Sequence, residues 1–115
     1  MIKNFFINFN NVKNSKDLAL RFNEVFNFAY PPIRDDKMNW DSFNDSFRSL
    51  DTESKTFIND PDFVKISGVH LILENYKTLD NLDSKDKKNL EEILEDNTKN
   101  GNRYDGLCFS YEIIN

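Results

Sequence analysis

Two aspartates four residues apart are the best candidates for chemistry in this sequence. Asp41 and Asp45 lie in the segment 39–50, whose apolar residues recur at helical spacing. Residues four apart lie side by side on a helix, so both carboxylates share one face, with Asn44 and Arg48 beside them. Such a pair can present negative charge to a basic surface, perform acid–base chemistry or contribute to a Mg²⁺ site.

Aromatic residues mark the opposite face of this predicted helix. The helical period, about 100° per residue, brings apolar side chains of the segment 39–50 into one narrow stripe. A stripe of this kind is typical of packing against a core, so we expect it to anchor the helix and turn its carboxylates outward. The stripe consists of Trp40, Phe43, Phe47 and Leu50.

Length and charge limit the functions open to the chain. Its length of 115 residues indicates one domain spanning residues 1–115. Its formal net charge is −5. Nucleic-acid binding calls for a basic surface, so the acidic balance argues against nucleic acid and suits a basic protein partner. The single cysteine, Cys108, excludes an internal disulfide and fits a cytoplasmic location. Residues 1–6 lack the pattern of a signal peptide, and we expect no membrane-spanning segment.

Apolar runs alternate with helical patterns along the chain, which indicates an α/β fold. The strands predicted at 69–73 and 107–114 are nearly continuous apolar runs, as expected for parallel strands covered on both faces. The order strand–helix–helix–strand–helix–strand implies a small three-stranded parallel sheet with covering helices, built from right-handed crossovers. The predicted elements are a strand at 5–9, a helix with Ser15 as its N-cap, a polar loop at 34–37, a helix at 39–50, the strand at 69–73, a helical turn at 79–82, a helix from Ser84 to Gly101 and the strand at 107–114.

Residues able to act as nucleophiles, bases or metal ligands are few. His70 is the lone histidine and lies inside an apolar predicted strand, which favours a packed or edge residue over a base or ligand. Cys108 has the position of a buried small hydrophobic residue rather than of a nucleophile. The sequence holds no glycine-rich phosphate loop, no Cys-x-x-Cys and no Gly-x-Ser-x-Gly. We therefore expect no metal, no cofactor and no enzymatic activity.

The sequence NWDSFNDSF at residues 39–47 resembles the central motif of the barstar family, the small intracellular inhibitors of secreted ribonucleases. The strand predicted at 69–73, followed by Glu74, is similar to the second strand of that family. Residues 90–101 and the apolar strand after them are similar to its last helix and strand. The resemblance extends over the whole chain and implies a barstar-like domain.

The resemblance also implies a function for the acidic helix. Asp45 would enter the active site of a target ribonuclease and occupy a phosphate-binding position, and Asp41 would support it from one turn earlier. Asp96, five residues before Gly101, would contribute from the last helix. A carboxylate can replace a substrate phosphate through charge-assisted hydrogen bonds to basic side chains. The implied partner is a basic ribonuclease or toxin, and we expect the chain to be a monomer when free.

The chain departs from the family pattern around this motif. Relatives commonly have a Tyr-Tyr-Gly-type segment before it, whereas residues 34–38 contain no glycine. Tyr30 would supply the aromatic side chain if residues 31–33 redirect the loop. Asn44 stands where relatives often have tryptophan, and the segment 51–66 is longer than the usual link to the second strand. These changes leave the target open, as a ribonuclease of another type or another basic toxin.

Other hypotheses use the same residues. Asp41 and Asp45 could serve a small metal-dependent or acid–base hydrolase, although the sequence offers no third group to complete such a site. The acidic face could also belong to a regulatory module that binds a different basic protein. The two carboxylates could finally be no more than the solvated face of an amphipathic helix.

Overall fold

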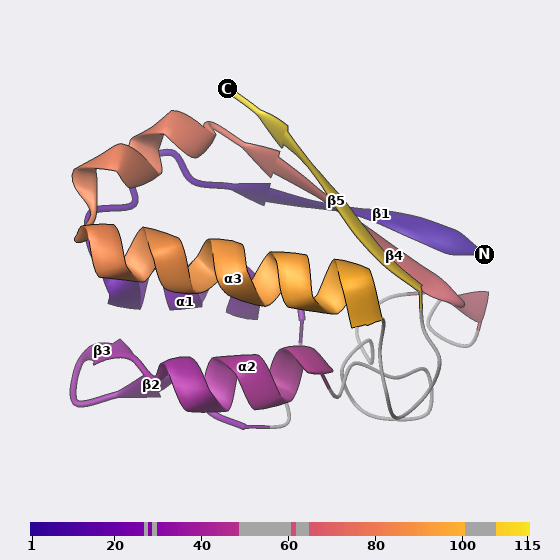
Figure 1. Cartoon of the computed structure of the whole chain (residues 1–115), viewed down its shortest axis with the longest axis horizontal. Coiled ribbons are helices and arrows are strands. Elements are labelled where there is room, and N and C mark those ends of the chain that lie inside the picture. The colour runs from indigo at the N-terminus through magenta and orange to yellow at the C-terminus, as the bar shows by residue number, and fades with distance from the viewer. Residues whose placement is uncertain (27, 29, 49–60, 62–64, 101–107) are drawn as a thin grey trace.

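A three-stranded parallel sheet forms one layer of the structure, and the helices lie on one side of it (Figure 1). The computed structural model describes residues 1–26, 28, 30–48, 61, 65–100 and 108–115. The strands of the sheet are, in spatial order, β1 (Ile2–Asn8), β4 (Gly68–Glu74) and β5 (Cys108–Ile114). β4 pairs in parallel with both neighbours, so that Phe5, Leu71 and Tyr111 form one row. The predicted α/β class and three-stranded parallel sheet are confirmed.

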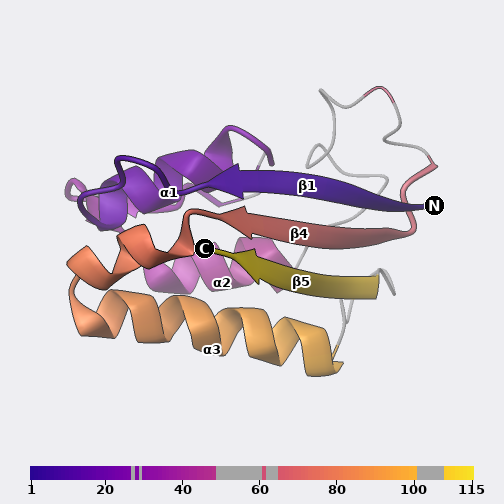
Figure 2. The same ribbon diagram turned by 90° about the horizontal axis from the view of Figure 1, so that it is seen from above.

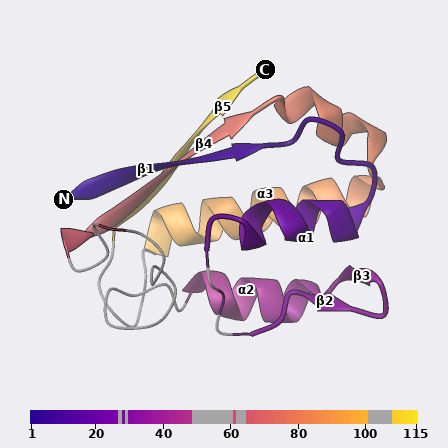
Figure 3. The same ribbon diagram turned by 180° about the vertical axis from the view of Figure 1, so that it is seen from behind.

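Helical segments fill the connections between these strands. They are α1 (Ser15–Asn23), α2 (Trp40–Arg48), the 3₁₀ helix η3 (Tyr76–Asn81) and α3 (Ser84–Asn100). The view from above shows α1 on the β1 side of the sheet and α3 on the β5 side (Figure 2). The view from behind shows α2 below both of them, farther from the sheet (Figure 3). The predicted order of strands and helices is confirmed, and η3 covers the predicted helical turn.

Residues 34–37, predicted as a polar loop, belong to a short hairpin. Its strands are β2 (Ile33–Arg34) and β3 (Lys37–Met38), which pair antiparallel. The turn residues Asp35 and Asp36 have φ angles of 53° and 64°. This is the left-handed region that two-residue hairpin turns require and that aspartate adopts more readily than most residues. The hairpin therefore gives a defined shape to the segment that leads into α2.

Aromatic rings fill the space between α2 and α1. Phe43 and Phe47 are buried on the inner side of α2. The ring of Phe22 on α1 meets them edge to face, with centroids 5.0 Å and 6.0 Å away respectively. The predicted apolar stripe is confirmed for Phe43 and Phe47, whereas Trp40 is half-buried. Leu50 lies outside the described residues.

β5 is more exposed than its sequence predicts. The apolar runs at 69–73 and 107–114 predict cover on both faces, but only β4 is buried along most of its length. The reason is position: β5 lies at the edge of the sheet, and among the described residues the helices cover one face only (Figure 1). Cys108, predicted to be buried, lies on the other face and is exposed, so that prediction is wrong.

The starts of two helices differ by one residue from their predictions. Asn14, not Ser15, caps α1, because its side-chain oxygen accepts a hydrogen bond from the backbone N–H of Asp17 at 2.9 Å. Asn39 makes the same kind of contact at α2, where its side chain accepts from the N–H of Ser42 at 3.2 Å. Both differences have the same cause. The residue whose side chain caps a helix precedes the first residue with helical dihedrals.

The remaining boundaries can be compared only where the chain is described. The first strand begins at Ile2 instead of residue 5. The start of α3 at Ser84 is confirmed, and its apolar residues Leu90, Ile93 and Leu94 are buried. Gly101, the predicted end of that helix, and residues 51–60 lie outside the described residues.

Two tyrosine hydroxyls bind carboxylates of α3. Tyr76 donates to Glu91 Oε1 at 2.9 Å, and Tyr111 donates to Glu95. Burial, followed by the hydrogen bond to the carboxylate, raises the pKa of Tyr76 well above its usual range and that of Tyr111 to about 12. Because both values are raised, the native state holds these protons more tightly than the unfolded chain does.

We therefore expect stability to fall at high pH. The contribution of the two hydroxyls is complete below the unfolded pKa of about 10 and is lost as pH rises through the folded values. Urea unfolding between pH 8 and pH 12 should show the advantage of the wild type over Tyr76→Phe shrinking above about pH 10. Tyr30→Phe changes an exposed phenol and serves as the control. A constant difference between wild type and Tyr76→Phe across this range would contradict the expectation.

Candidate functional site

The outer face of α2 carries the two aspartates as predicted. Asp41 and Asp45 are exposed, whereas Phe43, Ser46 and Phe47 are buried on the inner side of the helix. Neither carboxylate makes a hydrogen bond or ion pair with another residue in the described part of the chain. The helix therefore offers two carboxylates, one turn apart, whose hydrogen-bonding capacity is open to a partner.

Asn44 and Arg48 border this pair, also as predicted. Both are partly buried, and each follows one of the aspartates by three residues, or about one helical turn. Arg48 lies in the last turn of α2, where a cation is favourable to the helix dipole. Its Nε is buried without a hydrogen-bond partner within the described ranges. Arg48 thus adds a positive charge to the same helix, three residues after Asp45.

A hydrogen bond ties the start of α2 to the start of α3. Trp40 Nε1 donates to Asp86 Oδ1 at 2.9 Å, and the indole packs edge-on against Phe43 with centroids 5.5 Å apart. Asp86 is a residue that the sequence does not point to, because 46 positions separate it from Trp40. This contact fixes the helix turn from which Asp41 projects.

We expect this anchor to contribute measurably to stability. Trp40→Phe removes the hydrogen bond while keeping an aromatic ring, and should lower the free energy of unfolding by about 1–2 kcal/mol. Urea unfolding measures the change. Asp86→Asn keeps an acceptor oxygen and should lose less. Equal stability of wild type and Trp40→Phe would mean that the contact does not anchor α2.

A second anchor joins α2 to the segment before the hairpin. The hydroxyl of Ser46, which is 2% exposed, accepts from Tyr30 N at 3.0 Å and donates to Tyr30 O at 3.1 Å. The side chain of Tyr30 is itself 50% exposed. The structure therefore brings Tyr30, a predicted contact residue, against α2. The only sequence signal for the contact between Ser46 and Tyr30 was a small polar residue on the apolar side of the helix.

The structure separates Asp96 from the aspartate pair. α2 and α3 run in the same direction from the Trp40–Asp86 contact (Figure 1). At about 1.5 Å per residue, Asp96 lies about 15 Å along α3 from that point, and Asp45 about 7.5 Å along α2. Asp96 is partly buried on its own helix. A partner would have to span both helices to touch Asp45 and Asp96 together.

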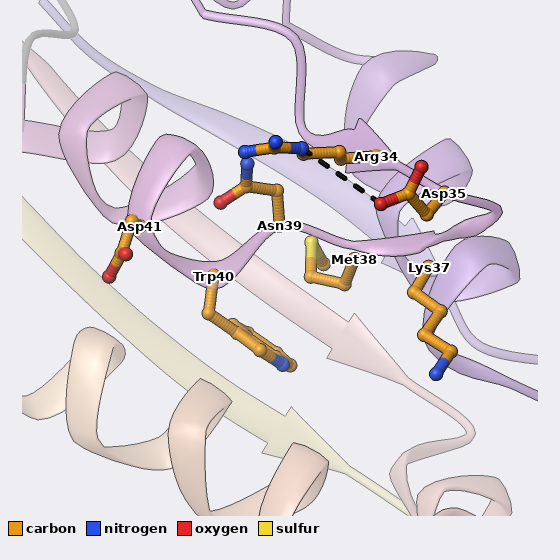
Figure 4. Close-up of a pocket in the computed structure, with 7 residues that line it drawn as sticks. All are labelled: Arg34, Asp35, Lys37, Met38, Asn39, Trp40 and Asp41. Carbon is orange, nitrogen blue, oxygen red and sulfur yellow. Dashed lines mark ion pairs between the residues drawn. The ribbon is translucent and has the colours of Figure 1, made fainter.

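An open depression adjoins the start of α2 (Figure 4). Its volume is about 390 Å³, and Figure 4 shows the guanidinium of Arg34 above the side chain of Asn39, while Asp41 points away from the hairpin. Asn39 N donates to Pro32 O at 2.7 Å, which holds the hairpin against the helix. The lining residues are Arg34, Asp35, Lys37, Met38, Asn39, Trp40 and Asp41. The hairpin thus adds charges of both signs beside the acidic face.

A separate polar cluster lies on the opposite, uncovered face of the sheet. His70 Nδ1 lies 2.7 Å from Ser110 Oγ, and His70 Nε2 lies 3.1 Å from Glu112 Oε1. His70 is thus a partly buried residue of the central strand, packed between polar neighbours of β5. Among the described residues, no group of three or more His, Cys, Asp or Glu side chains is arranged to hold a metal ion. In the same part of the chain, every helix is too short or too polar to cross a bilayer.

Known proteins do not identify the family of this chain. Comparison with family models, with curated proteins and with solved structures found no match. The similarity of residues 39–47 to the barstar motif therefore stays a prediction. The function has to be argued from the residues of the site and their contacts.

Proposed function

We propose that the chain is a barstar-like inhibitor that blocks the active site of a basic ribonuclease or toxin with the acidic face of α2. One observation carries the proposal. Asp41 and Asp45 are exposed and make no hydrogen bond or ion pair with another described residue, on a helix whose inner side is buried. A carboxylate without an internal partner gains most from a basic surface, because no existing bond is broken on binding.

Preorganisation of α2 supports the proposal. The Trp40–Asp86 hydrogen bond holds its first turn, and the Ser46 contacts with Tyr30 hold its second half. A rigid helix loses little conformational freedom when it binds, so more of the electrostatic attraction appears as affinity.

The resemblance to the barstar family implies the roles of the individual residues. Asp45 occupies a phosphate-binding position of the target, and Asp41 contacts a basic side chain next to it. Asn44, Arg48 and Tyr30 lie at the border of the contact, while Asp96 meets a different part of the target. The proposed contact thus has a charged centre and a polar rim, whereas the centre of most protein interfaces is apolar and poor in charged residues. Ribonucleases concentrate Lys, Arg and His around the phosphodiester, and a fixed carboxylate satisfies these donors without being cleaved. The inhibitor acts in the cytoplasm in this proposal.

The association rate with a barnase-type ribonuclease tests the proposal. Attraction between opposite charges accelerates encounter, and salt screens it. We expect the rate constant, measured by stopped-flow fluorescence, to fall at least about tenfold between about 10 mM and about 1 M salt. Binding heat measured in parallel should show a one-to-one complex. Absence of binding heat, or an association rate constant that does not change with salt, would refute the proposal for this target.

A further inference from the structure

The outer edge of β5 has no strand partner among the described residues. β5 pairs with β4 on one side only. Cys108 N donates to Ser67 O, so the backbone groups of Cys108 face β4. Successive residues of a strand direct their N–H and C=O groups to opposite edges. The backbone groups of Phe109, Tyr111 and Ile113 therefore face the free edge.

This edge lacks three of the features that usually prevent pairing. Edge strands are commonly protected by lysine, proline or a bulge. β5 has the sequence CFSYEII, without lysine or proline, and its register with β4 shows no bulge, whereas the opposite edge strand β1 carries Lys3. Its one charged residue, Glu112, lies with Oε1 3.1 Å from His70 Nε2 of the central strand. Ile113 and Ile114 are 45% and 48% exposed. The edge of β5 is thus a template for another strand.

The strand is also complementary to itself. In an antiparallel pair of two copies centred on Tyr111, Phe109 lies opposite Ile113, Cys108 opposite Ile114 and Ser110 opposite Glu112. Apolar residues then meet apolar ones, no like charges oppose each other, and all of β5 is paired. A register centred on Glu112 instead brings two carboxylates together and leaves part of the strand unpaired.

We propose that β5 is a dimerisation edge, at which two copies of the chain pair antiparallel about Tyr111 and form one continuous six-stranded sheet. The outward backbone groups of three opposed pairs would exchange about six hydrogen bonds. The contact is isologous, so the two-fold symmetry closes it at two copies and leaves no further edge of β5 exposed. The inference does not depend on the proposed inhibitor function, and it replaces the monomer that the sequence analysis expects.

Disulfide trapping tests the register. In this arrangement Cys108 lies opposite Ile114 of the second copy, at a non-hydrogen-bonded pair with Cα atoms about 4.5 Å apart, within the range that a disulfide spans. Ile114→Cys should therefore give a covalent dimer with two symmetric disulfides when the full chain is treated with oxidised glutathione. The glutathione is reduced as the disulfides form. Non-reducing electrophoresis detects the product.

Ile113→Cys is the matched control. Residue 113 lies on the opposite face of the strand from Cys108, so its thiol cannot reach Cys108 of a second copy in this register. We expect Ile113→Cys and the wild type to stay uncrosslinked under the same conditions. Equal crosslinking of the two variants, or none of Ile114→Cys, would overturn the proposal.

Sedimentation equilibrium tests the association without crosslinks. The wild-type mass should rise from one chain to two as the concentration increases. Ile113→Lys places a charge at the edge and should remain a monomer, with circular dichroism showing that it folds. Phe6→Lys changes an exposed apolar residue on β1, 57% exposed, and should still dimerise. A wild type that stays monomeric at millimolar concentration, or dimerisation of Ile113→Lys equal to that of wild type, would contradict the proposal. Neither readout involves a ribonuclease, so this proposal and the inhibitor function can fail separately.

Discussion

Replacing Asp45 with alanine will weaken binding of the target ribonuclease by at least about 2 kcal/mol, or about thirtyfold in Kd. The physical reason is that the basic side chains of the target, once desolvated in the complex, lose the carboxylate that neutralises them. Because Asp45 is exposed and makes no bond with another described residue, the free energy of unfolding should change by less than about 0.5 kcal/mol. Calorimetric titration measures the first quantity and urea unfolding the second.

Glu92→Ala provides the matched control. Glu92 is an exposed carboxylate on α3 whose only described ion pair, with Lys88, has a separation of 3.9 Å. Glu92→Ala removes the same unit of charge from the chain as Asp45→Ala does, and should leave the affinity for the target within about twofold of wild type. Asp41→Ala should have an intermediate effect. Similar losses for Asp45→Ala and Glu92→Ala would show that net charge, not the acidic face of α2, determines the affinity.

Replacing Phe43 with alanine will lower the free energy of unfolding by about 3–5 kcal/mol. Phe43 is 0% exposed, and its ring meets those of Phe22 at 5.0 Å and Phe47 at 5.4 Å. Truncation removes the transfer free energy of the ring and leaves a cavity between α1 and α2 that rigid neighbours fill only in part. Urea unfolding measures the loss.

Two variants complete this experiment. Phe43→Leu removes less volume and should lie between wild type and alanine, which keeps the test informative if Phe43→Ala does not fold. Phe6→Ala truncates the same kind of ring at a position that is 57% exposed, and should cost less than about 1 kcal/mol. If Phe6→Ala destabilised the protein as much as Phe43→Ala, the packing of α2 described above would be wrong.

The sequence predicts those parts of the site that depend on periodicity. The spacing of Phe43 and Phe47 orients α2, and the same spacing sets Asp41 and Asp45 on the exposed side. The order of apolar runs likewise predicts the parallel sheet, because helices separate its strands along the chain. These features need only local information, and each of them agrees with the structure.

Contacts between distant residues could not be predicted in this way. The Trp40–Asp86 hydrogen bond joins residues 46 positions apart, and the hydrogen bonds between Ser46 and Tyr30 join residues 16 positions apart. No local pattern selects one partner among many aspartates or backbone groups. The Asp35–Asp36 turn is different, since two adjacent turn-forming residues indicate a turn, although the flanking Arg34 and Lys37 do not favour strands.

The exposure of β5 could be predicted in part from the sequence. Residues 109–113 alternate apolar and polar side chains, the period of a strand covered on one face, but the strand as a whole was interpreted as a continuous apolar run. Cys108 was therefore assigned to the interior, although it lies on the uncovered face. The same exposure supports pairing of β5 with a second copy. Amino-acid composition alone does not distinguish an apolar strand that pairs with another chain from one that packs in a core.

Residual RNA cleavage by a barnase-type ribonuclease, titrated with the purified chain, tests the central claim most directly. If the acidic face of α2 blocks the active site, cleavage of a fluorogenic RNA substrate should fall in proportion to added protein and vanish near one equivalent. The same titration with Asp45→Ala should leave cleavage measurable at one equivalent. Full cleavage in the presence of excess wild-type chain, for this ribonuclease and for other basic ribonucleases and toxins, would contradict the account.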